Sequence, residues 1–235
     1  MDKIKSIEEY GRVYVSENLK FQVGNRDLIY NDWHKSLDFI FSKVFYRGRR
    51  DELSERFMNA ALGTLKGFEL GKNYDKLLLE IRLKENGVNN SADRRMVAEI
   101  LDFVFSLSET YKFNLVRYSV EKIKNGEIAE IFSEFDKIFA IGDKLASFYL
   151  RDVVLVFKLE NNLKLEDFRY CQPIDTWVRQ VAIRLGIIDQ LEKKNEKIKL
   201  SIINACRKVN VSPLSFNAGA WMVGAKSFDL LIERL

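Results

Sequence analysis

Lys144 and Asp175 are the two residues whose types and settings suit covalent chemistry. Lys144 follows the apolar turn at 138–142 and precedes an apolar run, so we expect it in the first turn of a helix. A lysine amine attacks carbon only when it is neutral, and a helix N-terminus in partly apolar surroundings favours the neutral amine. Asp175 follows Pro173 and also opens a helical segment, whose dipole favours an ionised carboxylate. The two residues predict a nucleophile and a charge that stabilises a cationic transition state.

Two segments with apolar residues at helical spacing flank the turn before Lys144, one at about 126–138 and one at 144–159. The first amides of the second helix lack acceptors within the helix, and the dipole makes that end positive. A helix, a tight hairpin and a second helix therefore direct backbone N–H groups at an anion. We expect Ala140 and Gly142 to contact a DNA phosphate without reading the base sequence.

The segment Ile138-Phe139-Ala140-Ile141-Gly142-Asp143-Lys144-Leu145-Ala146 resembles the helix-hairpin-helix of the endonuclease III and 8-oxoguanine glycosylase superfamily. That hairpin is written Leu-Pro-Gly-Val-Gly-x-Lys-x-Ala, and Lys144 falls on the lysine that attacks the damaged nucleotide. Phe139 replaces the proline and Ala140 the first glycine, which predicts a turn of different shape.

Pro173-Ile174-Asp175-Thr176 is similar to the superfamily segment that contains the catalytic aspartate, so Asp175 falls on that residue, while Trp177 stands where many relatives have histidine. The 31 positions between Lys144 and Asp175 resemble the spacing in the archaeal 8-oxoguanine DNA glycosylase branch. Taken singly, a surface lysine and a plain helix cap are the ordinary alternatives for the two residues.

The C-terminal segment at 211–224 is similar to the segment of that branch in which an acid and a tryptophan hold the base. Asn217 stands in place of the acid, and Trp221 falls on the tryptophan, for which a core aromatic is the alternative. The resemblance implies that these residues and Pro173 contact a base flipped out of the duplex. Gln22 and Phe148 are further candidates, because an amide and an aromatic ring suit a flipped base.

A basic turn follows Tyr46 and contains Arg47, Arg49 and Arg50. We expect these arginines to contact phosphate, and a solvated turn between helices is the alternative.

Composition limits the classes of protein that fit. The chain has 235 residues, a net charge of +4, two cysteines without CxxC spacing and a single histidine, His34. These residues cannot assemble a structural zinc site or the iron–sulfur cluster of many endonuclease III relatives, so we expect no metal and no cofactor. No apolar run of membrane-spanning length and no apolar signal core at the N-terminus are present, which predicts an intracellular protein without a membrane partner. The resemblance implies a cytoplasmic, nucleoid-associated prokaryotic protein that acts as a monomer.

Only two prolines interrupt the chain, which favours an all-α fold. We expect one glycosylase-type unit over 1–235, with a helix-hairpin-helix at about 126–159 and sub-lobes at 55–165 and at 1–54 plus 166–235. The expected helices lie at 1–20, 28–45, 51–70, 74–84, 92–107, 109–124, 126–138, 144–159, 175–186, 195–209 and from 214 onward. Ser91 and Ser212 are expected N-caps, and Pro213 suits a first helical position.

The resemblance implies a bifunctional DNA glycosylase/AP lyase that excises 8-oxoguanine from double-stranded DNA. Three alternatives remain at this stage. The first is a non-catalytic helix-hairpin-helix DNA-binding module, the second a glycosylase for oxidised pyrimidines, and the third a helical protein-interaction domain.

Overall fold

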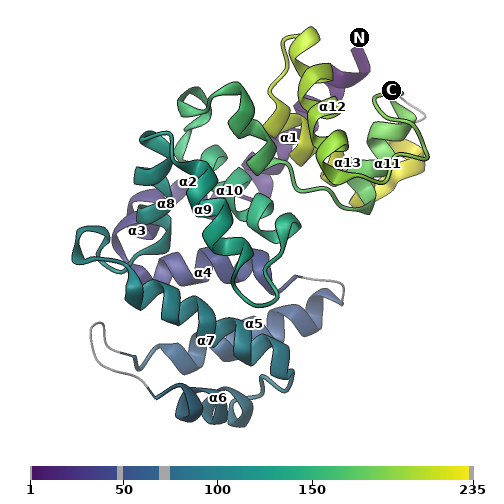
Figure 1. Ribbon diagram of the computed structural model, residues 1–235. Coiled ribbons are helices and arrows are strands. Elements are labelled where there is room, and N and C mark those ends of the chain that lie inside the picture. Colours follow the sequence, from purple (N-terminus) through teal and green to yellow (C-terminus); the bar gives the residue numbers. More distant parts are fainter. Residues whose placement is uncertain (1, 47–49, 69–74, 233–235) are drawn as a thin grey trace. The chain divides into compact units, whose positions relative to one another are not determined.

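The computed structural model describes residues 2–46, 50–68 and 75–232, and these residues form helices joined by turns (Figure 1). No strand occurs in this part of the chain, so the all-α prediction is confirmed. Within the same residues, no helix combines the length and the apolar character that a membrane crossing requires.

The chain divides into two compact units, and the boundary falls inside a helix. Unit 1 comprises Met1–Gly24 and Leu150–Leu235, and unit 2 comprises Asn25–Tyr149. The helix α10 (Asp143–Phe157) begins in unit 2 and ends in unit 1. The boundaries thus lie at residues 24 and 149, whereas the sequence placed sub-lobe boundaries at 54 and 165.

Unit 2 packs around the aromatic ring of Tyr149, which is fully buried on α10. Its ring lies 4.8 Å from that of Phe135 and 5.7 Å from that of Phe39, and its hydroxyl lies 3.0 Å from Ser119 Oγ. The hydroxyl therefore has a partner inside the core, as a buried phenol requires. The helices of this unit are α3 (Arg26–Asn31), α4 (Trp33–Val44), α5 (Asp51–Leu65), α6 (Lys76–Glu85), α7 (Ser91–Ser106), η1 (Glu109–Tyr111), α8 (Leu115–Lys124) and α9 (Ile128–Asp136).

Unit 1 is built on the packing of its first helix against its last. The helices α1 (Asp2–Glu17) and α13 (Pro213–Ile232) approach so closely that a Cβ on Gly11 would overlap the carbonyl oxygen of Ser215. A Cβ on Gly219 would likewise overlap the carbonyl oxygen of Ile7. The other helices of this unit are α2 (Lys20–Gly24), η2 (Glu160–Asn162), η3 (Leu165–Cys171), α11 (Thr176–Arg184) and α12 (Asn195–Lys208), with the end of α10.

Several local predictions are confirmed. Ser212 accepts a hydrogen bond at Oγ from the backbone N–H of Ser215 (3.1 Å), and Pro213 is the first residue of α13. The residues of α10 from Leu145 to Val154 are buried except for Phe148, which is half-buried, as the apolar sequence indicates. These features depend on residues that are close together in the sequence, so the sequence alone was enough to predict them.

Three differences from the expected helices have a clear cause in named residues. The helix expected at 28–45 is interrupted at Asp32, whose backbone is extended and whose carboxylate accepts a hydrogen bond from Lys35 N. The side-chain amide of Asn114 holds this break by donating to the carbonyl oxygens of Ile29 (2.9 Å) and Asp32 (3.0 Å). Asn90, rather than Ser91, caps α7.

The third difference concerns the helix expected at 109–124. Lys112 and Phe113 adopt positive φ angles of 52°, which are incompatible with a continuous right-handed helix. The segment therefore forms η1 and then α8, which begins at Leu115.

Replacing Gly219 by alanine is expected to destabilise unit 1, because the added methyl group meets the backbone of α1 rather than a movable side chain. The free energy of unfolding should fall by roughly 2 kcal/mol or more. Gly63→Ala in α5 is the matched control, since a Cβ there meets nothing within 4 Å, and it should stabilise slightly through helix propensity. Urea unfolding of both variants tests this, and equal stability of the two would contradict the close approach of α1 and α13.

Candidate functional site

The segment between α9 and α10 forms a tight hairpin. The amide of Ile138 donates to Phe135 O (3.0 Å), and the amide of Ile141 donates to Ile138 O (2.9 Å). Ala140 has a φ of 65°, in the left-handed region that favours glycine. Ala140 stands at the position of the first glycine in the helix-hairpin-helix motif that the segment resembles, and its backbone is left-handed.

The start of α10 is open to an approaching ligand. Gly142 O accepts hydrogen bonds from the amides of Leu145 (2.9 Å) and Ala146 (3.1 Å), so the helix begins immediately after Gly142. Gly142 is exposed, and a Cβ at this residue would meet no atom within 4 Å. The glycine is therefore not required by packing inside the protein, and its backbone is accessible.

The side chain of Lys144 is exposed, whereas Leu145, Ala146 and Ser147 after it are buried. Its amine is therefore accessible, although the partly apolar surroundings expected from the sequence do not enclose it here. Phe148, one helical turn further on, lies on the same face of α10. The Lys43 ammonium lies 5.3 Å from the centre of the Phe148 ring, so Phe148 is held by cation–π contact.

Glu99 on α7 anchors the hairpin. Its carboxylate accepts a hydrogen bond from the Phe139 amide (2.6 Å) and another from Arg95 Nε (2.8 Å). The Arg95 guanidinium in turn lies 4.0 Å from the centre of the Phe139 ring. Burial alone would raise the pKa of Glu99, but the hydrogen bonds from Phe139 and Arg95 lower it below its usual value.

Asp175 is the N-cap of α11, and its Oδ1 accepts a hydrogen bond from the amide of Val178 (2.8 Å). Asp175 is half-buried as a residue. Trp177, which stands where many members of the resembled superfamily have histidine, is 38% exposed, and a Cβ on Gly224 would overlap its side chain. Trp177 therefore packs against α13.

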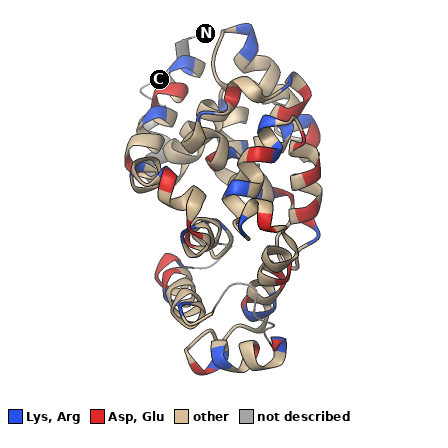
Figure 2. Cartoon of the chain, turned by 90° about the vertical axis from the view of Figure 1, so that its left-hand side faces the viewer, with Lys and Arg blue, Asp and Glu red and all other residues tan. Residues whose placement is uncertain are grey.

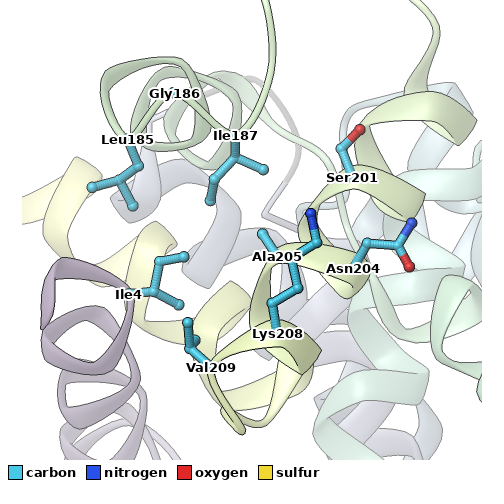
Figure 3. Close-up of a pocket in the computed structure, with 9 residues that line it drawn as sticks. All are labelled: Ile4, Leu185, Gly186, Ile187, Ser201, Asn204, Ala205, Lys208 and Val209. Atoms are coloured by element: carbon cyan, nitrogen blue, oxygen red, sulfur yellow. The ribbon is translucent and has the colours of Figure 1, made fainter. Parts of the chain in front are cut away.

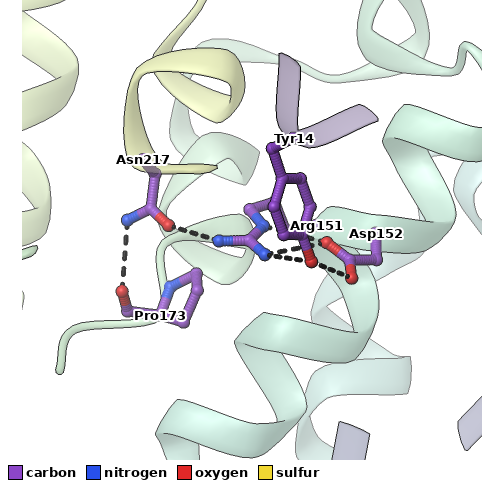
Figure 4. Close-up of polar contacts among 5 residues, drawn as sticks. All are labelled: Tyr14, Arg151, Asp152, Pro173 and Asn217. Carbon is purple, nitrogen blue, oxygen red and sulfur yellow. Dashed lines mark hydrogen bonds and ion pairs between the residues drawn. The ribbon is translucent and has the colours of Figure 1, made fainter. Parts of the chain in front are cut away.

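Two residues before Asp175, the backbone joins a buried polar network, which we call the Arg151 network: Tyr14, Arg151, Asp152, Asn217 and the carbonyl of Pro173 (Figure 4). Arg151 is 1% exposed, and its guanidinium donates to Asp152 Oδ1 from Nε (3.0 Å) and from Nη2 (2.9 Å). It also donates to the Tyr14 hydroxyl (3.1 Å) and to Asn217 Oδ1 (2.9 Å).

Protonation states in the network follow from burial and charge. Burial alone would lower the pKa of Arg151, but the Asp152 carboxylate and then the Tyr14 oxygen raise it above its usual value. Burial and then the charge of Asp152 raise the pKa of Tyr14 well above its ordinary value. The tyrosine is therefore a neutral donor to Asp152 Oδ2 (2.8 Å), beside a charged ion pair.

Asn217 faces this network and not the surface. Its side chain is fully buried, its Oδ1 accepts from Arg151, and its Nδ2 donates to Pro173 O (3.1 Å). In this structure a flipped base cannot reach the amide. Trp221, one turn further along α13, is half-buried against the unit 1 core, with its ring 5.7 Å from that of Tyr14 in an edge-on arrangement.

Gln22 differs from Asn217, because its Oε1 is buried without a hydrogen-bond partner among the described residues. Such an oxygen is costly to bury and suits a donor supplied by a ligand. Among the residues predicted to contact a base, Gln22 therefore has a free acceptor oxygen among the described residues, whereas the side-chain oxygen of Asn217 is already bonded to Arg151.

Two of the three predicted phosphate arginines, Arg47 and Arg49, lie outside the described residues. Arg50 is exposed and precedes α5 as its N-cap, without a capping bond from its side chain. In the view of Figure 2, Lys and Arg are interspersed with Asp and Glu along the helices, in keeping with the small net charge of +4.

The structure groups the candidate residues in two sets. Ala140, Gly142, Lys144 and Phe148 gather at the start of α10 in unit 2. The other set belongs to unit 1 and contains Pro173, Asp175, Asn217 and Trp221, with Gln22 on α2. The proposed nucleophile and the proposed carboxylate thus belong to different units.

Arg151 and Asp152 were not among the residues selected from the sequence. The signal that would have found them is an adjacent pair of opposite charges inside the apolar run of α10, since charged residues are rarely buried unless paired. Tyr14 and Gln172 have no comparable signal, because their partners lie far away in the sequence.

A pocket of about 540 Å³ lies elsewhere in unit 1 (Figure 3). One face of α12 supplies Ser201, Asn204, Ala205 and Lys208, and the apolar side chains of Ile4 and Ile187 lie opposite. None of the candidate catalytic residues lines it. Within the described part of the chain, no cluster of three or more His, Cys, Asp or Glu residues has the arrangement of a metal site.

Replacing Glu99 by glutamine is expected to weaken the hairpin anchor at neutral pH by about 1 kcal/mol, because a charged acceptor of two hydrogen bonds is lost. The folded-state pKa of Glu99 is lowered, so its contribution is complete above the usual glutamate pKa and disappears as the pH falls through the folded-state value. Urea unfolding from neutral pH to about pH 3 should show the two proteins converging in acid. A pH-independent difference would contradict the anchor, and Glu85→Gln, at an exposed position on α6, is the control.

Comparison with protein-family models, with curated proteins and with solved structures gives no match for this chain. The comparisons therefore assign it to no family.

Proposed function

We propose that this chain is a bifunctional DNA glycosylase/AP lyase that excises 8-oxoguanine, with Lys144 as the nucleophile. The observation that supports this most directly is an accessible lysine in the first turn of an otherwise buried helix, directly after a tight hairpin. The left-handed conformation of Ala140 supports the likeness to a helix-hairpin-helix, because the glycine of that motif allows the same conformation.

The chemistry follows from the two side chains. The neutral amine of Lys144 attacks the anomeric carbon of the damaged nucleotide, the glycosidic bond breaks, and the base leaves with the bonding electrons and takes up a proton. The amine loses its proton as the sugar ring opens to a Schiff base, and removal of a proton from the neighbouring carbon then expels the 3′ phosphate. The Asp175 carboxylate stabilises the cationic sugar while the glycosidic bond breaks.

DNA is held in this proposal by the first amides of α10 and by basic side chains near the hairpin. Arg95 fits this role because it is exposed and stacked on Phe139 of the hairpin. Such contacts bind phosphate and position the duplex without reading sequence. The protein would act as a monomer on double-stranded DNA in the prokaryotic cytoplasm, at the nucleoid.

Recognition of the lesion requires an acceptor for the hydrogen on N7, which 8-oxoguanine has and guanine lacks. The buried Oε1 of Gln22 suits this acceptor role better than Asn217 does, because the Asn217 amide is already engaged. The half-buried rings of Phe148 and Trp221 would supply stacking surface.

Lys144→Gln is expected to abolish borohydride trapping on a duplex that contains 8-oxoguanine, while duplex binding persists, because the amine forms the covalent bond and backbone amides hold the phosphate. Lys137→Gln is the matched control, since it removes an equal charge from an exposed position on the same hairpin. A trapped adduct that survives in Lys144→Gln would overturn the assignment of the nucleophile. Salt-sensitive DNA retention by the wild type without any adduct would indicate a non-catalytic binding module.

Asp175→Asn is expected to slow base release by on the order of a hundredfold, because a charge directed at a developing cation is lost. Asparagine caps helices as well as aspartate does, so the fold of α11 should be kept. Single-turnover release of 8-oxoguanine measures the effect, and circular dichroism checks the helix content. An unchanged rate would reduce Asp175 to a helix cap.

A further inference from the structure

The segment before Asp175 is fastened to the first turn of α13 by a reciprocal pair of hydrogen bonds. The side chain of Asn217 donates to the backbone oxygen of Pro173 (3.1 Å), and the side chain of Gln172 donates to the backbone oxygen of Pro213 (3.2 Å). Asn217 and Gln172 are both fully buried, and Pro213 and Asn217 are one helical turn apart. We call these two bonds the Pro173 clamp.

The clamp is fixed in turn by Arg151. Asn217 can donate to Pro173 only if its amide is oriented with Nδ2 toward that carbonyl, and the bond from Arg151 to Oδ1 imposes this orientation (Figure 4). The guanidinium is itself held by Asp152 and Tyr14. An unbroken series of buried hydrogen bonds therefore runs from α1 and α10 to the backbone two residues before Asp175.

Between the clamp and the carboxylate the chain has little freedom. Pro173 has a φ fixed by its ring, and the side chain of Ile174 is buried. Asp175 follows at once, and its Oδ1 accepts from the Val178 amide. Movement of the Pro173 carbonyl would therefore move the Asp175 carboxylate and lengthen its bond to Val178.

We propose that Asn217, Gln172 and Arg151 are positioning residues that set the place of the Asp175 carboxylate through the Pro173 clamp. This inference rests on the proposed function for its catalytic consequence, while the clamp itself acts on the structure of unit 1. Asn217 accordingly contributes by holding backbone rather than by touching the base.

The test uses two variants of the whole chain. Asn217→Asp is nearly isosteric, keeps an acceptor for Arg151 and loses the donor to Pro173. Gln172→Leu removes the second bond of the clamp and is the milder change, because the Oε1 that it also removes has no partner among the described residues. Ile202→Val, in the unit 1 core on α12, is the control for a general loss of stability.

The first readout is hydrogen exchange at the Val178 amide, which reports the bond to Asp175 and requires no catalysis. Exchange at Val178 should accelerate about fivefold to tenfold relative to the amides of α12 in both clamp variants, the scale expected when one hydrogen bond is lost. In Ile202→Val, the exchange rate of the Val178 amide should change only in proportion to the exchange rates of the α12 amides. The proposal would be overturned if exchange at Val178 in the clamp variants rose only in proportion to exchange in α12, or did not rise at all.

The second readout is single-turnover base release. Each clamp variant should slow release about tenfold, while its affinity for the lesion duplex stays unchanged. Combined with Asp175→Asn, each clamp substitution should slow release little further, because it acts through the Asp175 carboxylate. Full additivity of the two substitutions would overturn the positioning role. A wild-type protein that forms no borohydride adduct would refute the proposed function alone, since exchange at Val178 still decides whether the clamp holds Asp175.

Discussion

The burial of the Arg151 guanidinium is the constraint on which unit 1 depends. A charged group with 1% exposure must have its donors satisfied within the protein, and removing one partner of such a pair costs about 3–5 kcal/mol. Asp152, Tyr14 and Asn217 meet this requirement, and they come from α10, α1 and α13. The network therefore joins three helices that are distant in the sequence, and its last bond reaches the segment that leads to Asp175.

A second constraint acts at the hairpin in unit 2. Ala140 adopts a left-handed conformation that costs an L-residue roughly 1 kcal/mol, so the surrounding structure must hold it. The bond from Phe139 N to Glu99, with Arg95 stacked over the Phe139 ring, ties the hairpin to α7. These contacts fix the position from which α10 starts, and hence the position of Lys144.

Asn217 shows how a motif position and its physical role can differ. The resemblance placed Asn217 where the archaeal 8-oxoguanine DNA glycosylase branch has an acid that holds the base, and an amide at this position still offers an acceptor. Full burial beside Arg151 gives the side chain a different task, because each of its polar atoms already bonds a group inside unit 1. The oxygen of Gln22, which has no hydrogen-bond partner in the part of the chain that the structure describes, is then the better candidate for contact with a lesion.

The sequence by itself determined the features that depend on near neighbours. Apolar spacing predicted the helices and the buried character of α10, and the cap formed by Ser212 with Pro213 was readable because both ends of the interaction lie within one turn. The cap that Asp32 forms at the break before α4 is also local. Only the tertiary structure decided the bonds by which Asn114 holds this break and the partners of Asn217. It also decided the unit boundary inside α10, where no glycine, proline or polar linker marks a change. The physical reason is that helices and caps form from local hydrogen bonds, whereas a buried polar group must find a partner that folding brings from elsewhere in the chain.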